Sequence, residues 1–414
     1  MSKLNELIKK LCPNGVEYKK LGEIATITRG GSFQKKDFVS AGIPCIHYGQ
    51  IYTKYGLFSE KTFSYLSEST AQKQKMAKTN DIIMAVTSEN IDDVCKCVAW
   101  LGTEEVAVSG HAAIIHHQQN AKYLSYFFHS SAFSNQKKAL AHGTKVIEVT
   151  PDKLSDIVIP VPPLIIQTTL VELLDSLTDA KVRLEKALRA EISYRETQYE
   201  HYYDRAFQSV AENSTQMEIS QVASTFIGLA TSVTKWKRDK GIQLLHNSDI
   251  CRNAIVCKKI EYLLPEFVQK NRGKILREND VITIHTGDVG TSAVVSKDYD
   301  GAIGFTTITS RVNDPEVVLP QYLCCYLNSR LCKQQIKSKT ISDRNNLNLK
   351  SFNQILIPIP KTMAQKHIVD LLLRIDDQWH EIKSLLMEEI QNRQKQYEYY
   401  VDKLLSFEEV IENG

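Results

Sequence analysis

The stretch that decides the fold occurs twice: IPVPPLIIQTTLVELLDSLTDAKVRLEKALRAEISYRETQYEHYYD at residues 159–204 returns as IPIPKTMAQKHIVDLLLRIDDQWHEIKSLLMEEIQNRQKQYEYYVD at residues 357–402. The copies are offset by 198 residues, close to half of the 414-residue chain. Identical residues recur in order, including Gln167 with Gln365 and Tyr199 with Tyr397. The chain is therefore built from two copies of one unit.

Both copies have the pattern of a long helix. No glycine or proline occurs between Pro163 and Gly228, and leucines and isoleucines recur at spacings of four and seven residues. This spacing gathers them on one face of a helix of roughly 40 residues, about 60 Å long. The stripe must be buried, and the nearest partner is its own repeat, so we expect a two-helix coiled coil. Chain length allows either direction; a pseudo-two-fold arrangement favours the antiparallel one.

The segments outside the helices match more weakly but in the same order. Asn80-Asp81 corresponds to Asn279-Asp280 at an offset of 199 residues. Runs of β-branched residues at 280–284 and 293–296 predict strands, and the patterns at 121–128 and 320–328 predict helices. We therefore expect a mixed α/β (α+β) fold, with two pseudo-symmetric globular domains separated by two long helices. The expected boundaries are 1–158, 159–207, 208–356 and 357–414.

The composition is that of a soluble globular protein, with 43% hydrophobic residues and a net charge of +3. Because the chain as a whole is not basic, any surface for anions must be local. The nine cysteines form no CxxC pair, which argues against zinc and favours reduced thiols in the cytoplasm. No P-loop, GxGxxG, HExxH or GxSxG motif is present. We expect no catalysis, metal or cofactor in this chain.

Basic and polar loops at equivalent places in the two halves are the candidates for binding DNA. Cations neutralise phosphates, while Arg, Gln and Asn side chains can bond base edges. For any one loop, simple solvation is the alternative; two clusters at matching places favour binding. The candidates are, in the first half, Arg29, Gly30, Gly31, Ser32, Gln34, Lys35, Lys36, Tyr48, Ser88, Asn90 and Lys145, and in the second half Lys235, Lys237, Arg238, Lys240, Asn247, Ser248, Thr286, Asp288, Arg344, Asn345 and Asn346. The neighbouring His47 and His246 are expected to be structural histidines.

Tyrosines and arginines cluster near the end of each long helix. Packing against the adjacent domain is the expected role for the tyrosines, and protein docking is the alternative, since Tyr and Arg often anchor interfaces. The docking candidates are Arg195, Tyr199, Tyr202, Arg393, Tyr397 and Tyr400.

At these residues the chain resembles the specificity subunits of type I restriction–modification systems. The resemblance covers the whole length and rests on Val16 to Ile24 (VEYKKLGEI), the doubled Ile-Pro-x-Pro, Gln167 and Gln365, and the Arg-x-x-Gln-Tyr-Glu-x-Tyr segments at 195–202 and 393–400. It implies two target recognition domains that each read one half of a split DNA sequence. It also implies that the helices fix the unread gap between the halves.

The same resemblance implies partners. Two modification (methyltransferase) subunits would dock on the helices and carry S-adenosylmethionine, and restriction (endonuclease and translocase) subunits would bring ATP and magnesium. Two other classes remain open from the residues alone: a protein scaffold that never touches DNA, and a self-contained restriction or methylation enzyme.

Overall fold

The computed structural model describes residues 2–339 and 346–408. The chain divides into two compact units, one formed by residues 1–187 with 388–414 and the other by residues 188–387. Each unit contains one globular part and one portion of each long helix.

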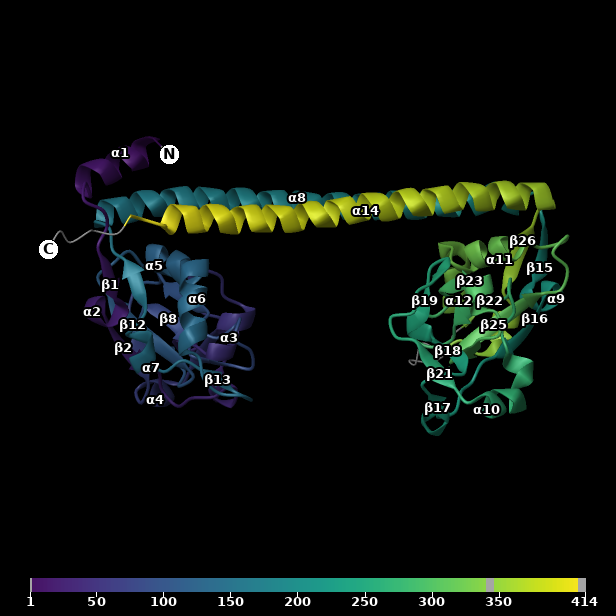
Figure 1. The fold of residues 1–414 in the computed structure, drawn as a ribbon, viewed down its shortest axis with the longest axis horizontal. Coiled ribbons are helices and arrows are strands. Elements are labelled where there is room, and N and C mark those ends of the chain that lie inside the picture. Colours follow the sequence, from purple (N-terminus) through teal and green to yellow (C-terminus); the bar gives the residue numbers. More distant parts are fainter. Residues whose placement is uncertain (1, 340–345, 409–414) are drawn as a thin grey trace. The chain divides into compact units, whose positions relative to one another are not determined.

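Both long helices expected from the repeat are present (Figure 1). Helix α8 (Leu164–Ala211) and helix α14 (Thr362–Leu405) contain neither glycine nor proline, the residues that most disfavour a helix interior. Strand β14 (Val158–Pro160) and a short connection containing Pro162 and Pro163 precede α8. The repeated Ile-Pro-x-Pro sequence therefore forms the end of a strand and the start of a short connection, and the helix begins after it.

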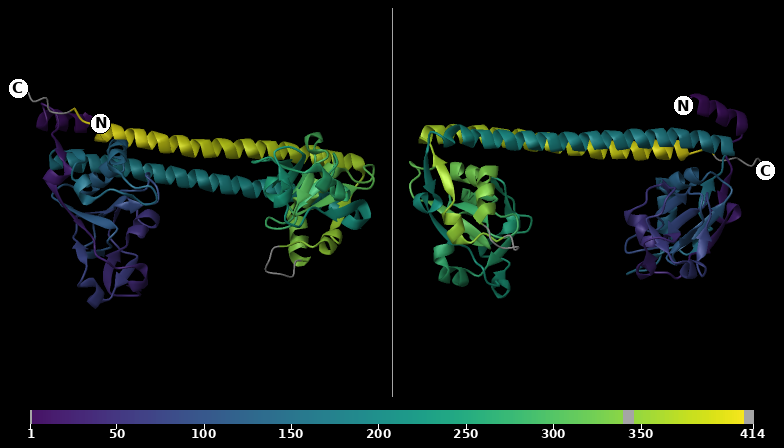
Figure 2. Two further views of the ribbon diagram at one scale, coloured as in Figure 1. Left: turned by 60° about the horizontal axis from the view of Figure 1, so that its bottom comes forward. Right: turned by 180° about the vertical axis from the view of Figure 1, so that it is seen from behind.

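The two helices run antiparallel within each unit, as Figure 2 also shows. In the first unit Leu173 of α8 and Leu404 of α14 line one groove, while Leu184 and Arg393 line a second one. The later residue of α8 therefore faces the earlier residue of α14. In the second unit Lys383 Nζ lies 3.7 Å from Glu196 Oε1. Three residues further along α8, the Tyr199 hydroxyl donates a hydrogen bond to Asp376, which precedes Lys383 in α14. The expected antiparallel coiled-coil pairing is confirmed.

A short strand pair holds the base of each globular part. Strand β1 (Tyr18–Lys20) pairs antiparallel with β14, the strand before α8. Strand β15 (Thr215–Glu218) pairs antiparallel with β26 (Leu356–Ile359), the strand before α14. Tyr18 is opposite Pro160 and Gln216 is opposite Pro358, so the same register recurs in both units.

The repeated glutamine ties each long helix to its globular part. Gln167 is fully buried; its Oε1 accepts from Asn120 N at 2.9 Å and its Nε2 donates to Pro162 O at 2.8 Å. Gln365 is buried in the same way and accepts from Leu319 N at 2.9 Å. A buried amide with all its bonds satisfied fixes one geometry, which explains why this residue is found in both copies.

In the first unit two five-stranded sheets form the globular part, with orders β2-β12-β8-β10-β5 and β3-β6-β4-β11-β7. Helix α5 packs on the first sheet and buries Tyr123 and Phe127 in a core shared with Leu170 of α8 and Leu405 of α14. The strands and helices are α1 (Ser2–Leu11), α2 (Leu21–Ile24), β2 (Ala25–Arg29), β3 (Phe38–Val39), β4 (Ile43–Ile46), α3 (Tyr48–Thr53), β5 (Phe58–Ser59), β6 (Ser64–Leu66), α4 (Glu68–Ala71), β7 (Lys75–Ala77), β8 (Ile82–Ala85), β9 (Thr87–Ser88), β10 (Cys97–Trp100), β11 (Val106–Val108), β12 (Ala112–His117), α5 (Ala121–Phe128), α6 (Ser131–Leu140), β13 (Ile147–Glu148) and α7 (Pro151–Leu154).

In the second unit the corresponding sheets have the orders β16-β25-β22-β23 and β17-β21-β18-β24. Tyr322 and Tyr326 of α11 pack against Phe207 of α8 in its main core. The strands and helices are α9 (Ile219–Val222), β16 (Ala223–Ile227), β17 (Lys237–Arg238), β18 (Ile242–His246), β19 (Ile250–Cys251), β20 (Ala254–Ile255), β21 (Glu261–Leu263), α10 (Pro265–Lys270), β22 (Val281–Ile284), β23 (Ser292–Val294), β24 (Ile303–Phe305), β25 (Thr307–Val312), α11 (Pro320–Leu327), α12 (Arg330–Lys339) and α13 (Leu349–Asn353). The mixed α/β fold and the predicted helices and strands are confirmed.

None of the described helices is both long and apolar enough to cross a membrane. All nine cysteines are free thiols, and Cys251 is the exposed one among them. Within residues 2–339 and 346–408, no three His, Cys, Asp or Glu side chains gather in a way that could hold a metal ion.

Candidate nucleic-acid interface

In the first unit the candidate loops meet at one edge of the sheet. Arg29 at the end of β2 is opposite Ala113, and Ala85 at the end of β8 is opposite Ala112. The loops that follow β2 and β8 therefore emerge beside the turn that leads into β12. Arg29 Nε donates to Gly110 O in that turn at 3.1 Å, and its guanidinium pairs with Glu148.

Gly30 and Gly31 serve this close approach of two loops. A Cβ on Gly30 would lie 2.3 Å from Ser109 O, and one on Gly31 would lie 2.0 Å from Gln74 Oε1. Gly30 therefore lets two backbone segments touch, whereas the nearest neighbour of Gly31 is the end of the Gln74 side chain. Beyond them, Ser32 and a short turn leave the side chains of Gln34, Lys35 and Lys36 exposed to solvent.

Tyr48, Ser88 and Asn90 line one cavity of about 390 Å³ next to this edge. The Tyr48 amide donates to Ser109 Oγ at 2.8 Å, and its ring centroid lies 4.9 Å from that of His111. Ser88 belongs to β9, which pairs with β13, and the exposed Lys145 lies two residues before β13. The cavity thus has an aromatic wall and a polar rim, and the rim also includes the carboxylates of Glu89 and Asp93.

Three residues at this edge are not among the candidates predicted from the sequence: Ser109, Gly110 and His111. The sequence signal that could have predicted them is the Ser-Gly pair before β12, which is typical of a turn. His47, by contrast, is a structural histidine as expected. It is buried, its Nδ1 accepts from Gly49 N at 3.2 Å, and burial lowers the pKa of its imidazole.

In the second unit the basic loop begins at Lys235 and continues through β17. The side chains of Lys235, Arg238 and Lys240 are exposed. Lys237 is instead held by Glu261, with Nζ 2.5 Å from Oε2. Hydrogen bonds from Lys237, His246 and Lys259 lower the pKa of Glu261 to about 2, so this carboxylate stays ionised.

Asn247 links the other candidate loops of the second unit. Its Nδ2 donates to Thr286 O at 2.9 Å, and its Oδ1 accepts from Thr306 Oγ1 at 2.6 Å. Thr286 forms an isolated β-bridge with Asn346. Asp288 accepts from Thr291 Oγ1 at 2.7 Å, and Ser248 is exposed next to Asn247. Arg344 and Asn345 lie outside the described residues.

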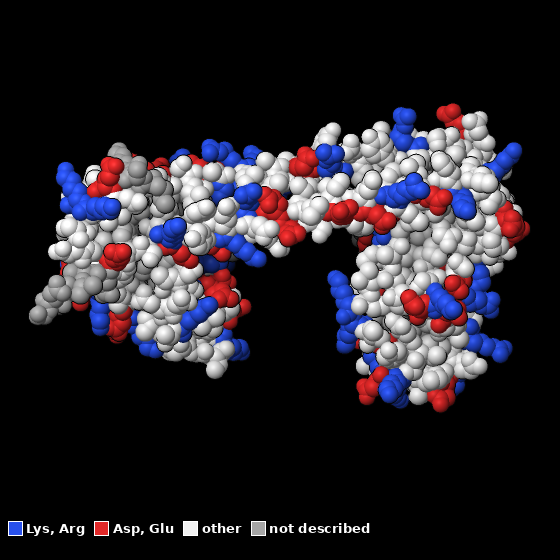
Figure 3. Space-filling model, turned by 45° about the horizontal axis from the view of Figure 1, so that its top comes forward, with Lys and Arg blue, Asp and Glu red and all other residues white. Residues whose placement is uncertain are grey.

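Charged side chains mark the surface of both units. Figure 3 shows Lys and Arg side chains over the globular part of the second unit, on the right, with Asp and Glu side chains among them. The charged surface is therefore mixed, and the exposed Lys235, Arg238 and Lys240 are the cations of the basic loop that could contact phosphates.

The docking candidates on the helices separate into exposed and buried residues. Arg195 and Arg393 are exposed and have the same bonds: Nε donates to Glu191 Oε1 and to Glu389 Oε1, each at 2.7 Å. Tyr202 is 51% exposed and Tyr400 41% exposed.

The two remaining tyrosines pack inside their units. Tyr199 is 6% exposed and bonds Asp376, so it belongs to the interior of the second unit. Tyr397 is half-buried, with its hydroxyl 3.0 Å from Thr178 Oγ1. For this pair the structure agrees with the packing role.

The fold and these loops define a class of protein. Two mixed α/β units share the same fold and contain the paired long helices, but the polar loops of the two units differ. The chain matches the family described as "Type I restriction modification DNA specificity domain" twice, over residues 13–194 and 217–392, and it belongs to that family. Membership of the specificity subunits of type I restriction–modification systems is therefore established.

Relatives support the assignment. A putative type I restriction enzyme specificity subunit of Haemophilus influenzae is 29% identical over 64% of this chain and 68% of the relative. The EcoR124I/EcoR124II specificity subunit of Escherichia coli is 26% identical over 60% of this chain and 61% of its own length. A chain from a structure of type I R-M complex assembly and conformational transition has a TM-score of 0.74 at 17% identity, covering 95% of this chain and 98% of its own. The HsdS subunit of Thermoanaerobacter tengcongensis has a TM-score of 0.53 at 16% identity, covering 95% and 97%. These two structures share the fold.

Proposed function

We propose that this chain selects the DNA sequence for a type I restriction–modification complex by reading a two-part target, one half-site with each globular domain. One contrast carries the proposal: the contacts that join helix and globular part are alike in the two units, whereas the loops differ. The buried Gln167 and Gln365 make matching bonds in the two units. The loops at the sheet edges differ between the units. In the first unit Tyr48 and Asn90 line a cavity, and in the second unit Asn247 bonds the backbone of Thr286.

Domain exchange tests this modular reading. Residues 208–356 of another family member replace those of this chain, and the partnered complex is assayed by mapping methylated sites across a genome. One half-site is expected to change while the other half-site stays the same. A change in both half-sites would contradict the proposal.

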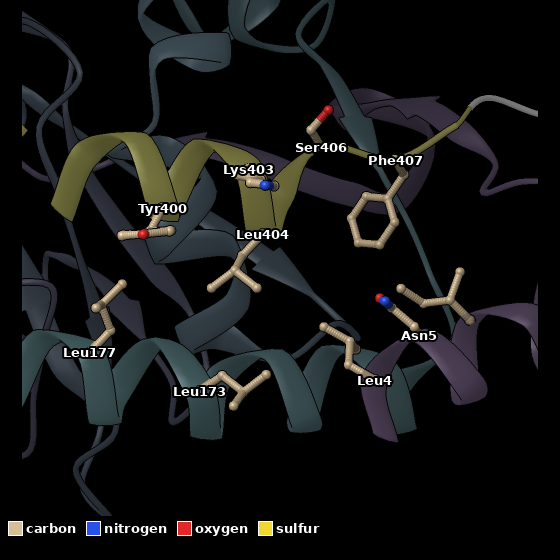
Figure 4. A pocket seen from close by; sticks show the side chains of 10 residues that line it. Leu4, Asn5, Leu173, Leu177, Tyr400, Lys403, Leu404, Ser406 and Phe407 are labelled. Atoms are coloured by element: carbon tan, nitrogen blue, oxygen red, sulfur yellow. The ribbon is translucent and has the colours of Figure 1, made fainter. Parts of the chain in front are cut away.

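The helices supply the surface for partner subunits. In the first unit an apolar cavity of about 620 Å³ opens between α1, α8 and α14, lined by Leu4, Leu173, Leu177 and Leu404 (Figure 4). It suits the apolar face of a partner helix, because such grooves accept amphipathic helices. Beside it, Tyr400 and Arg393 line a second groove that continues along the helices.

We therefore propose that each unit docks one modification subunit, and that Arg195 with Tyr202 and Arg393 with Tyr400 anchor the two copies. The paired variant Arg195→Glu, Tyr202→Ala is expected to bind one methyltransferase subunit in place of two, measured as complex mass in solution. Retention of both subunits would contradict the docking role of these residues. The matching pair in the first unit provides the reciprocal control.

The chain itself is proposed to be non-catalytic, with S-adenosylmethionine, ATP and magnesium bound by the modification and restriction subunits. Incubating the isolated chain with labelled S-adenosylmethionine and target DNA is expected to give no transfer. Transfer would favour a self-contained enzyme instead. A scaffold that avoids DNA would be favoured if the partnered complex showed no salt-sensitive, sequence-selective binding.

A further inference from the structure

In the second unit a β-hairpin of the globular part touches both long helices. It is formed by β19 and β20, and its turn consists of Arg252 and Asn253. Asn253 has a φ of 58°, a left-handed conformation that asparagine tolerates better than most residues. The turn therefore has a defined backbone shape that presents both side chains to the helices.

Arg252 covers the aromatic side chains of α8. Its guanidinium carbon lies 4.6 Å from the ring centroid of Tyr199 and 4.0 Å from that of Tyr203, and it also forms an ion pair with Glu200. Only about a fifth of the Arg252 side chain is exposed, at 22%. Cation–π contacts strengthen when the cation is removed from water, so this side chain binds the hairpin to α8.

The side-chain amide of Asn253 bonds both long helices and a residue next to α11. Its Nδ2 donates to Tyr203 Oη of α8 at 3.0 Å and to Asp376 Oδ2 of α14 at 2.5 Å. Its Oδ1 accepts from Asn328 Nδ2, just after α11, at 2.7 Å. Asn253 therefore joins the hairpin to both long helices and to the residue that follows α11.

Asp376 makes this junction costly to open. Its carboxylate is buried and also accepts a hydrogen bond from the Tyr199 hydroxyl. Removing hydrogen-bond partners from a buried carboxylate leaves an uncompensated charge in a low-dielectric site. The first unit has Thr178 and Tyr397 at the equivalent helix positions, joined hydroxyl to hydroxyl at 3.0 Å. The charged junction is thus a feature of the second unit's own design.

We propose that the Arg252–Asn253 turn is a clasp that fixes the angle of the second globular domain on the helices, and that this angle makes the complex discriminate between gap lengths. Each base pair inserted into the gap moves the second half-site along and around the DNA axis. A domain held at one angle faces the DNA groove of its half-site at one gap length only. A domain that can change its angle faces that groove at several gap lengths. The clasp hypothesis rests on the function proposed above.

The first test measures gap discrimination. Arg252→Leu and Asn253→Gly remove the side-chain contacts, and the glycine keeps the left-handed backbone. The partnered complex is titrated with duplexes whose gap is correct or altered by one base pair. Preference for the correct gap is expected to fall about tenfold in both variants, because the domain samples more angles. Arg252→Lys, which retains a cation for Glu200, is expected to lose less. Lys297→Leu, on the exposed surface of the same unit, should leave the preference unchanged.

An altered second half-site sequence, or an unchanged gap preference in a folded variant, would overturn the proposal. Because the sequence of the half-site is read by other loops, the clasp variants are expected to recognise the same bases at the correct gap.

The second test needs no DNA. Cys324 is buried beneath the turn, with its Sγ 3.5 Å from Asn253 Oδ1, while Cys332 is buried elsewhere in the same unit. Thiol labelling followed by peptide mass spectrometry is expected to modify Cys324 about tenfold faster in both variants, with Cys332 still protected. Equal protection of Cys324 in the variants and the unaltered chain would refute the clasp.

The two tests separate the clasp from the function on which it rests. Faster labelling of Cys324 in a complex that shows no sequence-selective DNA binding would contradict the proposed function and not the clasp contact. If both cysteines were labelled faster in Arg252→Leu, that variant would be globally unstable, and Asn253→Gly would decide.

Discussion

Arg311 donates two hydrogen bonds to the buried carboxylate of Asp280, from Nε to Oδ1 at 2.8 Å and from Nη2 to Oδ2 at 2.7 Å. In the first unit His116 has the equivalent place in β12, and its Nδ1 lies 2.7 Å from Oδ1 of Asp81. The repeat has therefore kept a buried aspartate and changed the group that pairs with it. The arginine pair is bidentate, which makes it the stronger of the two.

Replacing Arg311 with leucine is expected to destabilise the second unit by about 2–4 kcal/mol, because Asp280 would stay buried without its cation. His116→Leu should cost the first unit less, roughly 1 kcal/mol or below, since the His116 side chain is 61% exposed. Denaturant titration with hydrogen exchange followed separately in each unit measures both values. Equal losses would show that the bidentate geometry does not matter here.

The turn around these aspartates shows how far the sequence could predict the structure. Both halves have an Asn-Asp pair at this turn. The asparagines, Asn80 and Asn279, adopt left-handed φ angles of 74° and 69°, which asparagine tolerates better than most residues. Each following aspartate then accepts a backbone N–H three residues back, Asp81 from Lys78 at 2.7 Å. Because turns of this kind require particular residue types, they can be predicted from the sequence.

Contacts between distant residues could not be predicted in the same way. The pairing of Asp280 with Arg311 depends on strand register, and the clasp at Arg252 depends on how a hairpin packs on helices. Its turn, Cys-Arg-Asn-Ala, carries none of the Asn-Gly or Asp-Gly signals of a two-residue hairpin. For the candidate interface, the sequence indicated the loops but not that Glu261 holds Lys237, or that Glu148 pairs with Arg29.

The stability of the first unit should fall as pH decreases from about 6.5 to 4. Burial lowers the pKa of His117 to about 4, and its Nδ1 accepts from Gln119 N at 3.1 Å. Because the folded pKa lies below that of the unfolded chain, protons bind the unfolded state first. The stabilisation is complete above the unfolded pKa and is lost as pH falls through the folded one, by on the order of 3 kcal/mol at most.

The variant His117→Asn keeps a hydrogen-bond acceptor but does not titrate in this range. Comparing the denaturation midpoints of the variant and the unaltered chain at several pH values isolates the contribution of His117. The difference between them should shrink or reverse toward pH 4. Parallel pH curves would contradict the assignment of this histidine as a buried neutral group.

Lys235 and Arg238 are expected to bind phosphates. Replacing both with alanine should weaken DNA binding to all sequences alike and reduce the slope of log K against log salt by about two, since each phosphate contact contributes close to one. Fluorescence anisotropy over a range of salt concentrations measures the slope. Lys366→Ala, at an exposed position of α14, is the matched control and should leave it unchanged.

Asn90 is expected to read a base in the first half-site, because it lines the cavity beside Tyr48 and Ser88. Asn90→Ala should relax the preference at one base pair by about 1–3 kcal/mol, and leave the second half-site intact. Asp288→Ala, in the corresponding loop of the other unit, should do the reverse. Binding to a library of randomised targets measures both. A uniform loss of affinity in Asn90→Ala would assign this residue to positioning instead.

The length of the paired helices is expected to set the gap between the half-sites. Deleting seven residues from each helix, 185–191 of α8 and 385–391 of α14, removes about two turns, or roughly 10 Å at 1.5 Å per residue. Since DNA rises 3.4 Å per base pair, the recognised gap should shorten by about three base pairs while both half-site sequences persist. Deleting the segment from α8 alone mismatches the pairing and should abolish selective binding. Methylation mapping of cells that carry each deletion gives the half-sites and the gap in one measurement. An unchanged gap in the double deletion would mean that something other than the helices separates the two reading domains.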